Sequence, residues 1–344
     1  MIKLDTTFVV GAGASADYGF PLGEQLTKQI AEALNFNSGS SSSQAKELIR
    51  NAIIVGCQRP GVQRDFRQLF GQARALQAAL TTASSIDAFL ENHSDNPDFE
   101  LLGKMAIAAC LITAEHGSEL RPRHPGEMID LALVEKSWLA RLFKTVMASG
   151  VPRASVEQIF DHVSFIVFNY DRCIEHYFEQ AIASHFMLDL PIAATIVRKH
   201  LRIVHPYGDL GALHDSDVNV SFGHEYRPET HAAGDGIYAM SQRLLTFTES
   251  KKAQGAKAKD MIHKSERLVF LGFGFGEQNV ELLRVSTSAV HQTRGTVMGL
   301  SKSNQDQVLY RIAQMTGTTL NAQLNDCDCT TLINDEQMFL TRSS

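Results

Sequence analysis

Five short apolar runs recur along the chain and are separated by longer stretches whose apolar residues have helical spacing. The runs lie at residues 6–10, 164–168, 201–204, 268–271 and 296–300. Apolar runs of this length that end in glycine or polar residues are typical of strands buried on both faces of a sheet. Strands that alternate with helices form parallel sheets with crossover connections. The pattern therefore predicts an α/β protein with a Rossmann-like parallel sheet of about five to six strands.

Residues 44–150, between the first two runs, have a helical pattern without strand-like alternation. Apolar residues recur there at the spacing of one helical face around 102–112 and around 131–146. The stretch is too long for a plain crossover, so we expect a helical insertion that caps the sheet within one domain of residues 1–344. A sheet of this size cannot cover every stripe, and uncovered apolar stripes indicate an oligomer or partner interface.

Four of the predicted strands are followed by turns rich in glycine or in hydrogen-bonding side chains, at 11–15, 169–171, 205–208 and 272–276. Ligands of an open parallel sheet bind outside the carboxyl ends of its strands, so we expect these turns to meet at one rim. The first turn, Gly-Ala-Gly-Ala-Ser-Ala, fits the G-x-G-x-x-G/A spacing, in which glycines let the backbone approach a pyrophosphate. The same composition also suits simple packing of a helix on a strand.

A dehydrogenase is disfavoured by the residues that follow this turn. Such an enzyme needs an acidic residue at the end of a second strand about 20 residues further on. Glu32 has roughly this offset but lies in a helical pattern. Gly19 and Pro21 also interrupt the helix that a dinucleotide-binding turn would begin.

The order of the motifs resembles the Sir2 (sirtuin) family, and more closely the bacterial Sir2-like branch found in antiphage defence. GAGAS and a Gly-x-Pro turn are followed by F-N-Y-D, by a strand-end histidine and by LGFGF. The segment SIDAFL at 85–90 resembles a sequence motif found in this branch. The resemblance covers residues 6–23, 164–178, 203–210 and 267–283, and it implies an NAD site on the predicted rim.

The resemblance also implies roles for single residues. Asn169 would hold the nicotinamide-side ribose and the attacking water, and His205 would be the general base, for which an imidazole suits working conditions near neutrality. Ala12, Gly13 and Ser15 would line the pyrophosphate. The residues assigned to NAD binding are Gly11, Ala12, Gly13, Ser15, Asp171, Gly272, Phe273, Gly274 and Asn279, of which Gly272 and Phe273 would face the adenosine ribose.

The catalytic pair also has a purely structural interpretation. His205 suits a buried or capping histidine, and Asn169 suits a turn in which its side chain bonds the nearby backbone.

Departures from the sirtuin pattern bear on the reaction. Protein deacylases of this family hold zinc with two pairs of cysteines, whereas this chain has one close pair, Cys327 and Cys329, which cannot supply four tetrahedral ligands. Residues 22–24, Leu-Gly-Glu, stand where sirtuins have Asp-Phe-Arg. We therefore expect no metal, and we expect water rather than an acyl-lysine to react with the ribose. A metal cluster at 214–217 is disfavoured because polar loops generate such groupings freely.

The expected activity is that of an NAD+ glycohydrolase, which converts NAD+ to nicotinamide and ADP-ribose. Its expected role is that of an antiphage effector that depletes NAD+ and so causes abortive infection. Two alternatives stay open: a non-catalytic regulatory subunit that binds NAD or ADP-ribose, and a protein deacylase.

Composition limits the cellular compartments and the classes of partner that we expect for this chain. The 344-residue chain has a formal net charge of −6 and five cysteines at scattered positions. This charge gives no general reason to expect nucleic-acid binding, and an odd number of scattered cysteines does not form a disulfide framework. We find no secretory signal pattern and no apolar run of the roughly 18–20 residues that span a bilayer. We therefore expect a cytoplasmic protein with no membrane partner and no nucleic acid bound by this chain alone.

The resemblance further implies a protein partner. Sir2-like proteins without a fused sensor domain are often paired with a separate protein, such as a HerA-type hexameric ATPase. Because a cell cannot tolerate an unregulated NAD+ hydrolase, we expect a homo-oligomer whose activity changes when such a partner binds.

Overall fold

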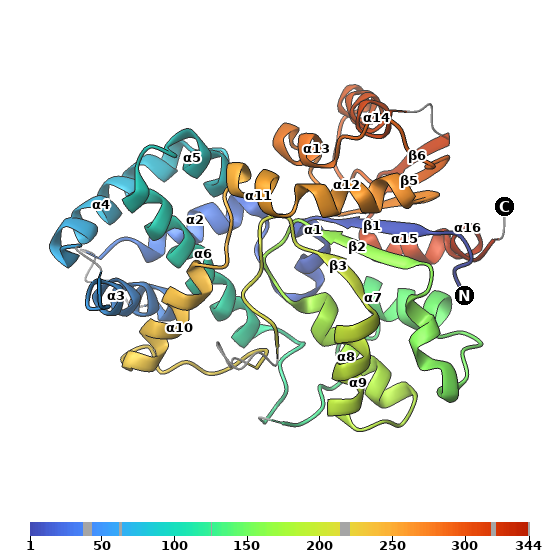
Figure 1. The fold of residues 1–344 in the computed structure, drawn as a ribbon, viewed down its shortest axis with the longest axis horizontal. Coiled ribbons are helices and arrows are strands. Elements are labelled where there is room, and N and C mark those ends of the chain that lie inside the picture. The colour runs from blue at the N-terminus through green and yellow to red at the C-terminus, as the bar shows by residue number, and fades with distance from the viewer. Residues whose placement is uncertain (37–42, 62–63, 125, 214–220, 318–320, 343–344) are drawn as a thin grey trace.

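The computed structural model describes residues 1–36, 43–61, 64–124, 126–213, 221–317 and 321–342. Within these residues, six parallel strands form one sheet in the order β3-β2-β1-β4-β5-β6 (Figure 1). The strands are β1 (Thr6–Val10), β2 (Val163–Val167), β3 (Arg202–Val204), β4 (Arg267–Leu271), β5 (Gln292–Thr296) and β6 (Asn321–Asn325). This is the strand order of dinucleotide-binding α/β folds. The predicted Rossmann-like α/β class is confirmed.

The strand order reverses between β1 and β4, at the centre of the sheet. The chain runs outward from β1 through β2 to β3, returns to the other side of β1, and runs outward again from β4 to β6. Val10 at the end of β1 pairs with Leu271 at the end of β4. The two turns that follow therefore start at the same level, at the point where ligands of this fold class bind.

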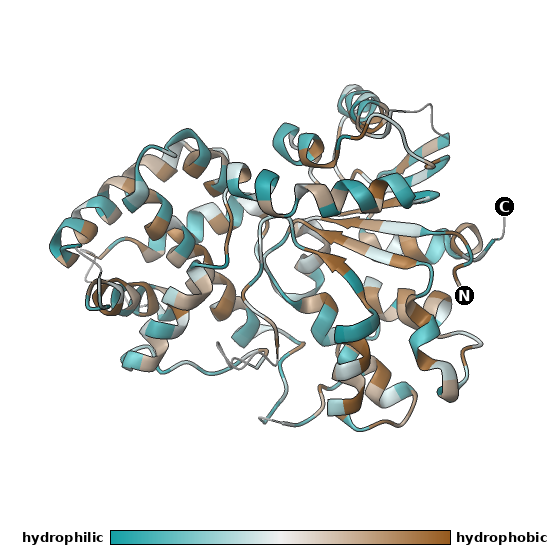
Figure 2. Ribbon diagram, in the orientation of Figure 1, coloured by the Kyte–Doolittle hydropathy of each residue, from teal (hydrophilic) through white to brown (hydrophobic). Residues whose placement is uncertain are grey.

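The central strands are buried on both faces. Every residue of β1 and of β4 is buried. Phe8 of β1 lies opposite Phe165 of β2, with the two rings stacked at a centroid distance of 5.3 Å. Burial on both faces explains why these strands are continuous apolar runs in the sequence. Figure 2 shows hydrophobic residues concentrated in the same strands.

The prediction for the fifth strand is wrong by four residues. The strand expected at 296–300 is β5, which ends at Thr296. Gly299 has a φ of +77°, and the Leu300 amide donates to the Val297 carbonyl at 3.0 Å, so this apolar segment forms a turn. The edge strand β6 was not among the apolar runs because its sequence, NAQLN, is polar and none of its residues is fully buried.

Helices cover both faces of the sheet. One face carries α12 (Gly255–Lys264), α13 (Glu277–Leu283) and α14 (Lys302–Thr316), and the other carries α7 (Trp138–Arg141), α8 (Cys173–His185), α9 (Leu190–His200), α15 (Cys329–Asp335) and α16 (Gln337–Thr341) (Figure 1). The short helix α1 (Ala12–Ser15) begins in the turn after β1.

A group of helices, which we call the helical lobe, lies beside the carboxyl end of the sheet (Figure 1). It consists of α2 (Gly23–Ala33), α3 (Gln44–Cys57), α4 (Phe66–Ala79), α5 (Ile86–Asn92), α6 (Pro97–Gly117) and α10 (His231–Ser241). Helix α11 (Phe247–Ala253) leads from the lobe back toward α12. Because α10 comes from the segment between β3 and β4, the lobe is built from two distant parts of the chain.

The predicted helical block divides between the lobe and the sheet. The stripe around 102–112 lies on α6, which packs against α2, α3, α4 and α10 of the same chain. Since this stripe is covered, it does not indicate an oligomer interface. The second stripe ends in α7 and a π-helical turn at Leu142–Met147, which pack against α15 and α16 beneath the sheet.

Among the described residues, no helix is both long enough and apolar enough to cross a membrane.

Candidate active site

The two glycine-rich turns touch each other at the point where the strand order reverses. The Gly11 amide donates to the Leu271 carbonyl at 2.9 Å, and the Gly13 amide donates to the Gly272 carbonyl at 3.1 Å. A Cβ atom on Gly272 would lie 2.2 Å from the Ala14 nitrogen, and Gly272 has a φ of +56°. A Cβ on Gly11 or Gly13 would lie within 3 Å of Gly272 atoms. These three glycines are therefore required by the contact between the turns.

The asparagine motif after β2 is tied to the glycine turn after β1. The Asn169 side-chain amide donates to the Ser15 hydroxyl at 2.7 Å and to the Gly11 carbonyl at 3.1 Å. The Ser15 hydroxyl in turn donates to the Asp171 carboxylate at 2.7 Å. All three side chains are buried. Buried polar groups with partners from another turn are held in one conformation, so this network fixes the rim.

His205 lies in the turn after β3 and is held by both ring nitrogens. Its Nδ1 is 3.0 Å from the Asn169 carbonyl oxygen, and its Nε2 is 3.0 Å from Oε1 of Glu175 on α8. Burial disfavours the charged imidazolium, but the nearby negative charges of Glu175 and Asp209 outweigh burial and raise the pKa of His205 to about 9. In this conformation His205 is therefore a hydrogen-bond donor near neutral pH, in contrast to the general base that the resemblance implies.

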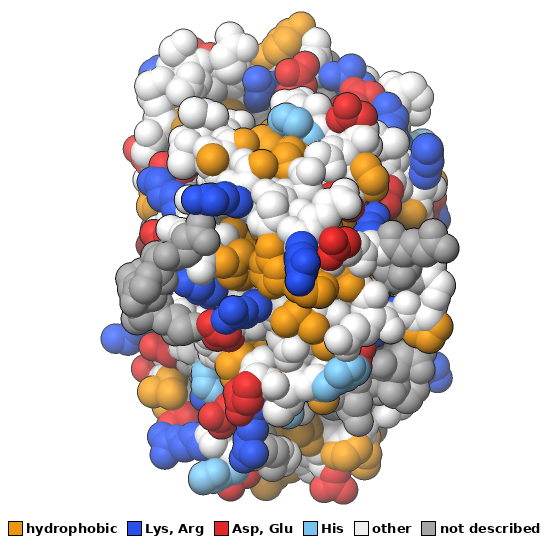
Figure 3. Space-filling model, turned by 90° about the vertical axis from the view of Figure 1, so that its left-hand side faces the viewer, with side chains coloured by type: hydrophobic (Ala, Val, Ile, Leu, Met, Phe, Trp, Pro, Cys, Tyr) orange, Lys and Arg blue, Asp and Glu red, His pale blue; other side chains and the backbone are white. Residues whose placement is uncertain are grey.

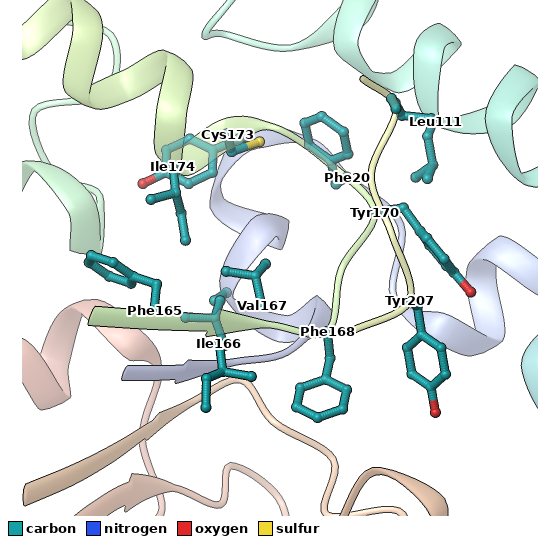
Figure 4. Packing of buried hydrophobic residues seen from close by; sticks show 14 of the residues in the cluster. Phe20, Leu111, Phe165, Ile166, Val167, Phe168, Tyr170, Cys173, Ile174 and Tyr207 are labelled. Atoms are coloured by element: carbon teal, nitrogen blue, oxygen red, sulfur yellow. The ribbon is translucent and has the colours of Figure 1, made fainter. Parts of the chain in front are cut away.

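Two tyrosines connect the rim to neighbouring helices. The Tyr170 hydroxyl donates to the Asp87 carboxylate of α5, and the Tyr207 hydroxyl donates to the Asn279 side chain of α13 at 2.7 Å. Figure 4 shows both tyrosines beyond the carboxyl end of β2, and their ring centroids are 6.2 Å apart. Burial raises the pKa of Asp87, although the Tyr170 hydrogen bond opposes this. The SIDAFL segment thus contacts the asparagine motif through the hydrogen bond between Asp87 and Tyr170.

The turn after β4 combines a packed aromatic wall with an open backbone. The Phe273 ring is buried 5.0 Å from the Phe168 ring, so its side chain belongs to the wall. Phe275 has a φ of +51°, which costs a non-glycine residue energy and is held by packing against Phe273. Gly274 between them is exposed, and a Cβ there would meet nothing within 4 Å. Strained backbone of this kind is concentrated at functional sites.

Glu175 also lines a cavity of about 540 Å³ beside the rim, between α8, α9 and the loop after β3. Its walls include the apolar residues Val197, Leu201 and Ile203 and the charged residues Arg198, Asp209 and Arg243. The Arg243 guanidinium lies 3.4 Å from the Asp209 carboxylate. Glu175 therefore lies between this cavity, at the edge of the sheet, and the His205 ring.

The structure brings most of the predicted site residues together. The contacts between four turns join Gly11, Gly13, Ser15, Asn169, Asp171, His205 and Gly272. Ala12 begins α1 and is half-buried. Phe273 and Gly274 lie in the turn after β4, and Asn279 is joined to Tyr207.

The sequence interpretation missed two residues that contact the rim. Glu175 has no local signal in the sequence, because its partner His205 lies 30 positions further along the chain. The Trp138 indole donates to the Ala14 carbonyl at 2.7 Å and carries no such signal, because the two residues are 124 positions apart.

The part of the chain that the structure describes contains no cluster of three or more histidine, cysteine or acidic side chains placed to hold a metal ion. Cys327 and Cys329 are both free thiols. The polar segment 214–217 lies outside the described residues. The expected absence of zinc stays a prediction.

Comparison of the sequence with models of known protein families found no match, and comparison with curated proteins found none either.

Proposed function

We propose that the chain is an NAD+ glycohydrolase that releases nicotinamide and leaves ADP-ribose. The observation that supports this most is the joining of the turns after β1, β2, β3 and β4 into one rim at the reversal of strand order. Dinucleotides bind at this point of the fold. The exposed backbone at Gly274 and the half-buried backbone at Ala12 and Gly13 suit the approach of a polar ligand.

In this reaction the protein positions the substrate and the water and stabilises the charge that develops on the ribose. The bond between the ribose and the pyridinium nitrogen breaks, its electron pair neutralises the departing nicotinamide, and water adds to the ribose carbon. The Asn169 amide nitrogen is already committed to Ser15 and Gly11. We assign its Oδ1 oxygen the role of accepting a hydrogen bond from a ribose hydroxyl or from the attacking water. His205 would accept a proton on the ribose side once its Nε2 is released from Glu175 and carries a lone pair.

A second function, the non-catalytic binding of NAD or ADP-ribose, is favoured by one observation. Both ring nitrogens of His205 face oxygen acceptors, so no lone pair is directed at a substrate in this conformation. A regulatory subunit needs such a rigid rim and has no need of a base.

The biological role and the partners are proposed from the resemblance alone. We propose an antiphage effector that depletes NAD+, assembles as a homo-oligomer and is regulated by a separate protein such as a HerA-type ATPase. The outer end of the helical lobe offers a surface for association. Figure 3 shows hydrophobic side chains gathered at the centre of that face, with lysine and arginine side chains around them. The lobe also has an exposed large hydrophobic side chain, Phe66 of α4, which is 45% exposed.

The test is to incubate the purified chain with NAD+ and to measure nicotinamide by chromatography and NAD+ binding by calorimetry. Nicotinamide release above the buffer control supports the hydrolase. Binding without release supports the regulatory subunit. The absence of both binding and release contradicts both functions.

A further inference from the structure

We infer that Glu175 is a positioning residue that holds His205 as a donor of two hydrogen bonds, and that His205 becomes a proton acceptor only when Glu175 moves away. The consequence for catalysis rests on the proposed function. The hydrogen bonds between Glu175, His205 and Asn169 do not depend on the proposed function.

When Glu175 is an ionised carboxylate, the hydrogen bonds around His205 need the doubly protonated ring. The Asn169 carbonyl oxygen faces Nδ1 and the Glu175 carboxylate faces Nε2, both at 3.0 Å. Each of these oxygens is an acceptor, and a neutral imidazole has one N–H only, so one of its lone pairs would face an oxygen. An imidazolium satisfies both contacts. The raised pKa of His205 agrees with this reading.

The other charged groups around the pair do not remove this preference. Asp209, in the loop after β3, adds negative charge and itself faces Arg243 at 3.4 Å. Arg172, just before α8, forms a fully buried ion pair with Glu115 of α6 at 2.6 Å. Arg198 of α9 and Glu179 of α8 line the same cavity as Glu175.

Glu175 has space to move, and within the described part of the chain only one of its two carboxylate oxygens is bonded. Its Oε1 bonds His205, whereas its Oε2 is buried and has no hydrogen-bond partner among the residues that the structure describes. The side chain is 22% exposed and lines the 540 Å³ cavity, so it has space to turn into. The His205 side chain is 5% exposed and would stay fixed through Nδ1.

The proton balance of the released state is simple. When Glu175 turns away, the Nε2 proton passes to water in the cavity, and Nδ1 keeps its proton for the Asn169 carbonyl. Nε2 then carries a lone pair. A substrate hydroxyl that enters the place left by Oε1 can give its proton to Nε2, so that an O–H bond breaks as an N–H bond forms. No oxidant or reductant is needed.

The test is a histidine titration followed by NMR on the chain labelled with ¹³C at the imidazole Cε1. The His205 signal is assigned by its loss in His205→Ala among the 13 histidines. We expect a midpoint of about 9 in the wild-type chain. In Glu175→Gln we expect a midpoint at or below the ordinary value of ~6.5, because burial, the largest effect on this ring, is then opposed by the smaller effects of Asp209 and the Asn169 carbonyl.

Glu179→Gln is the matched control, since it removes the same charge from the same helix and cavity one turn further on. It should leave the His205 midpoint unchanged. Glu175→Asp keeps the charge on a shorter side chain and should give an intermediate midpoint. If Glu175→Gln does not fold, the midpoint of Glu175→Asp is compared with that of the wild type instead. A wild-type midpoint near 6.5, or equal midpoints in the wild type and Glu175→Gln, overturns the inference.

A second measurement separates this inference from the proposed function. If the chain hydrolyses NAD+, the pH at which nicotinamide release rises should shift down in Glu175→Gln, and release at neutral pH should increase by as much as ~100-fold, in proportion to the neutral fraction of His205. If the NMR midpoint shifts and no variant releases nicotinamide, the hydrolase proposal fails and the role of Glu175 in holding the imidazolium stands.

Discussion

The Ser15 hydroxyl occupies a central position in the rim because it bonds two residues of the asparagine motif at once. It accepts a hydrogen bond from Asn169 and donates one to Asp171. A hydroxyl can do both, whereas an alanine or an acidic side chain in its place could not. Buried polar groups that lose a partner are costly, so a substitution at any of the three residues acts on the others.

Replacement of Asn169 by alanine is expected to abolish nicotinamide release if the chain is a hydrolase. It should also lower the free energy of unfolding by about 1–3 kcal/mol, because the Gly11 carbonyl and the Ser15 hydroxyl lose their shared donor. Chromatography of the product and urea unfolding measure the two effects. Asn325→Ala, at the carboxyl end of the edge strand β6, is the control. Release at the wild-type rate by Asn169→Ala contradicts the assigned role.

The stability of the folded chain should fall at alkaline pH through His205. Its pKa is raised in the folded state to about 9, so the stabilisation is complete below the ordinary value of ~6.5 and is lost as the pH rises through about 9. Free energies of unfolding in urea, measured across this range, should decline more in the wild type than in Glu175→Gln. Parallel curves for the two proteins would exclude this contribution.

At the scale of elements, the two glycine turns act as one unit. Backbone atoms of one turn lie where side chains of the other would have to be placed, so β1 and β4 can be followed only by residues without a Cβ at the points of contact. The same close approach brings the turn after β2 within reach, because Asn169 bonds the Gly11 carbonyl.

Substitution of Gly272 by alanine tests this unit. Its φ of +56° alone costs a non-glycine residue roughly 1–2 kcal/mol, and the Cβ would meet the Ala14 nitrogen at 2.2 Å. We expect a loss of more than ~2 kcal/mol in the free energy of unfolding or a failure to fold. Gly274→Ala, two residues on, places its Cβ in open space and should fold normally. Equal stability of both variants would show that the turns can separate.

At the scale of the whole molecule, the lobe and the sheet share one core. The buried hydrophobic residues of α6 and of β1 belong to the same contiguous cluster. Two polar ties cross the boundary as well: the buried ion pair between Glu115 and Arg172, and the hydrogen bond between Asp87 and Tyr170. Breaking the ion pair would leave a buried charge without its partner, which is strongly unfavourable.

Hydrogen exchange should therefore show the lobe and the sheet opening together. Peptides from α6 and from β1 are expected to reach the same maximal free energy of exchange and to lose protection at the same urea concentration. Mass spectrometry of exchanged peptides measures both regions in one sample. Exchange of α6 at a much lower free energy than β1 would show that the lobe unfolds by itself.

The sequence predicted the features that depend on neighbours along the chain. β1 and β4 were found because burial on both faces gives each a run of apolar residues at its carboxyl end, FVV in β1 and LVFL in β4. The turns at their carboxyl ends were found because glycines end the runs. The expected position of β5 was wrong by four residues and β6 was missed, because pairing with neighbouring strands, rather than apolar side chains, defines them.

Contacts between distant residues could not be predicted in this way. The Asp87–Tyr170 pair spans 83 positions and the His205–Glu175 pair spans 30. The protonation of His205 depends on the second of these pairs, so the sequence pointed to a histidine at the rim but not to its charge. The glycine motif was likewise compatible with ligand binding and with packing, and the contact between the turns shows the packing role.

Trp138 is the single tryptophan of the chain, and its indole bonds the backbone of the glycine turn. Its side chain is 1% exposed, so when tryptophan is excited selectively over the seven tyrosines, the emission comes from one dry position against that turn. A ligand that moves the Ala14 carbonyl changes the electric field on this one fluorophore. Occupancy of the rim is then readable as a spectral shift in the unlabelled protein, in real time and without any product being formed.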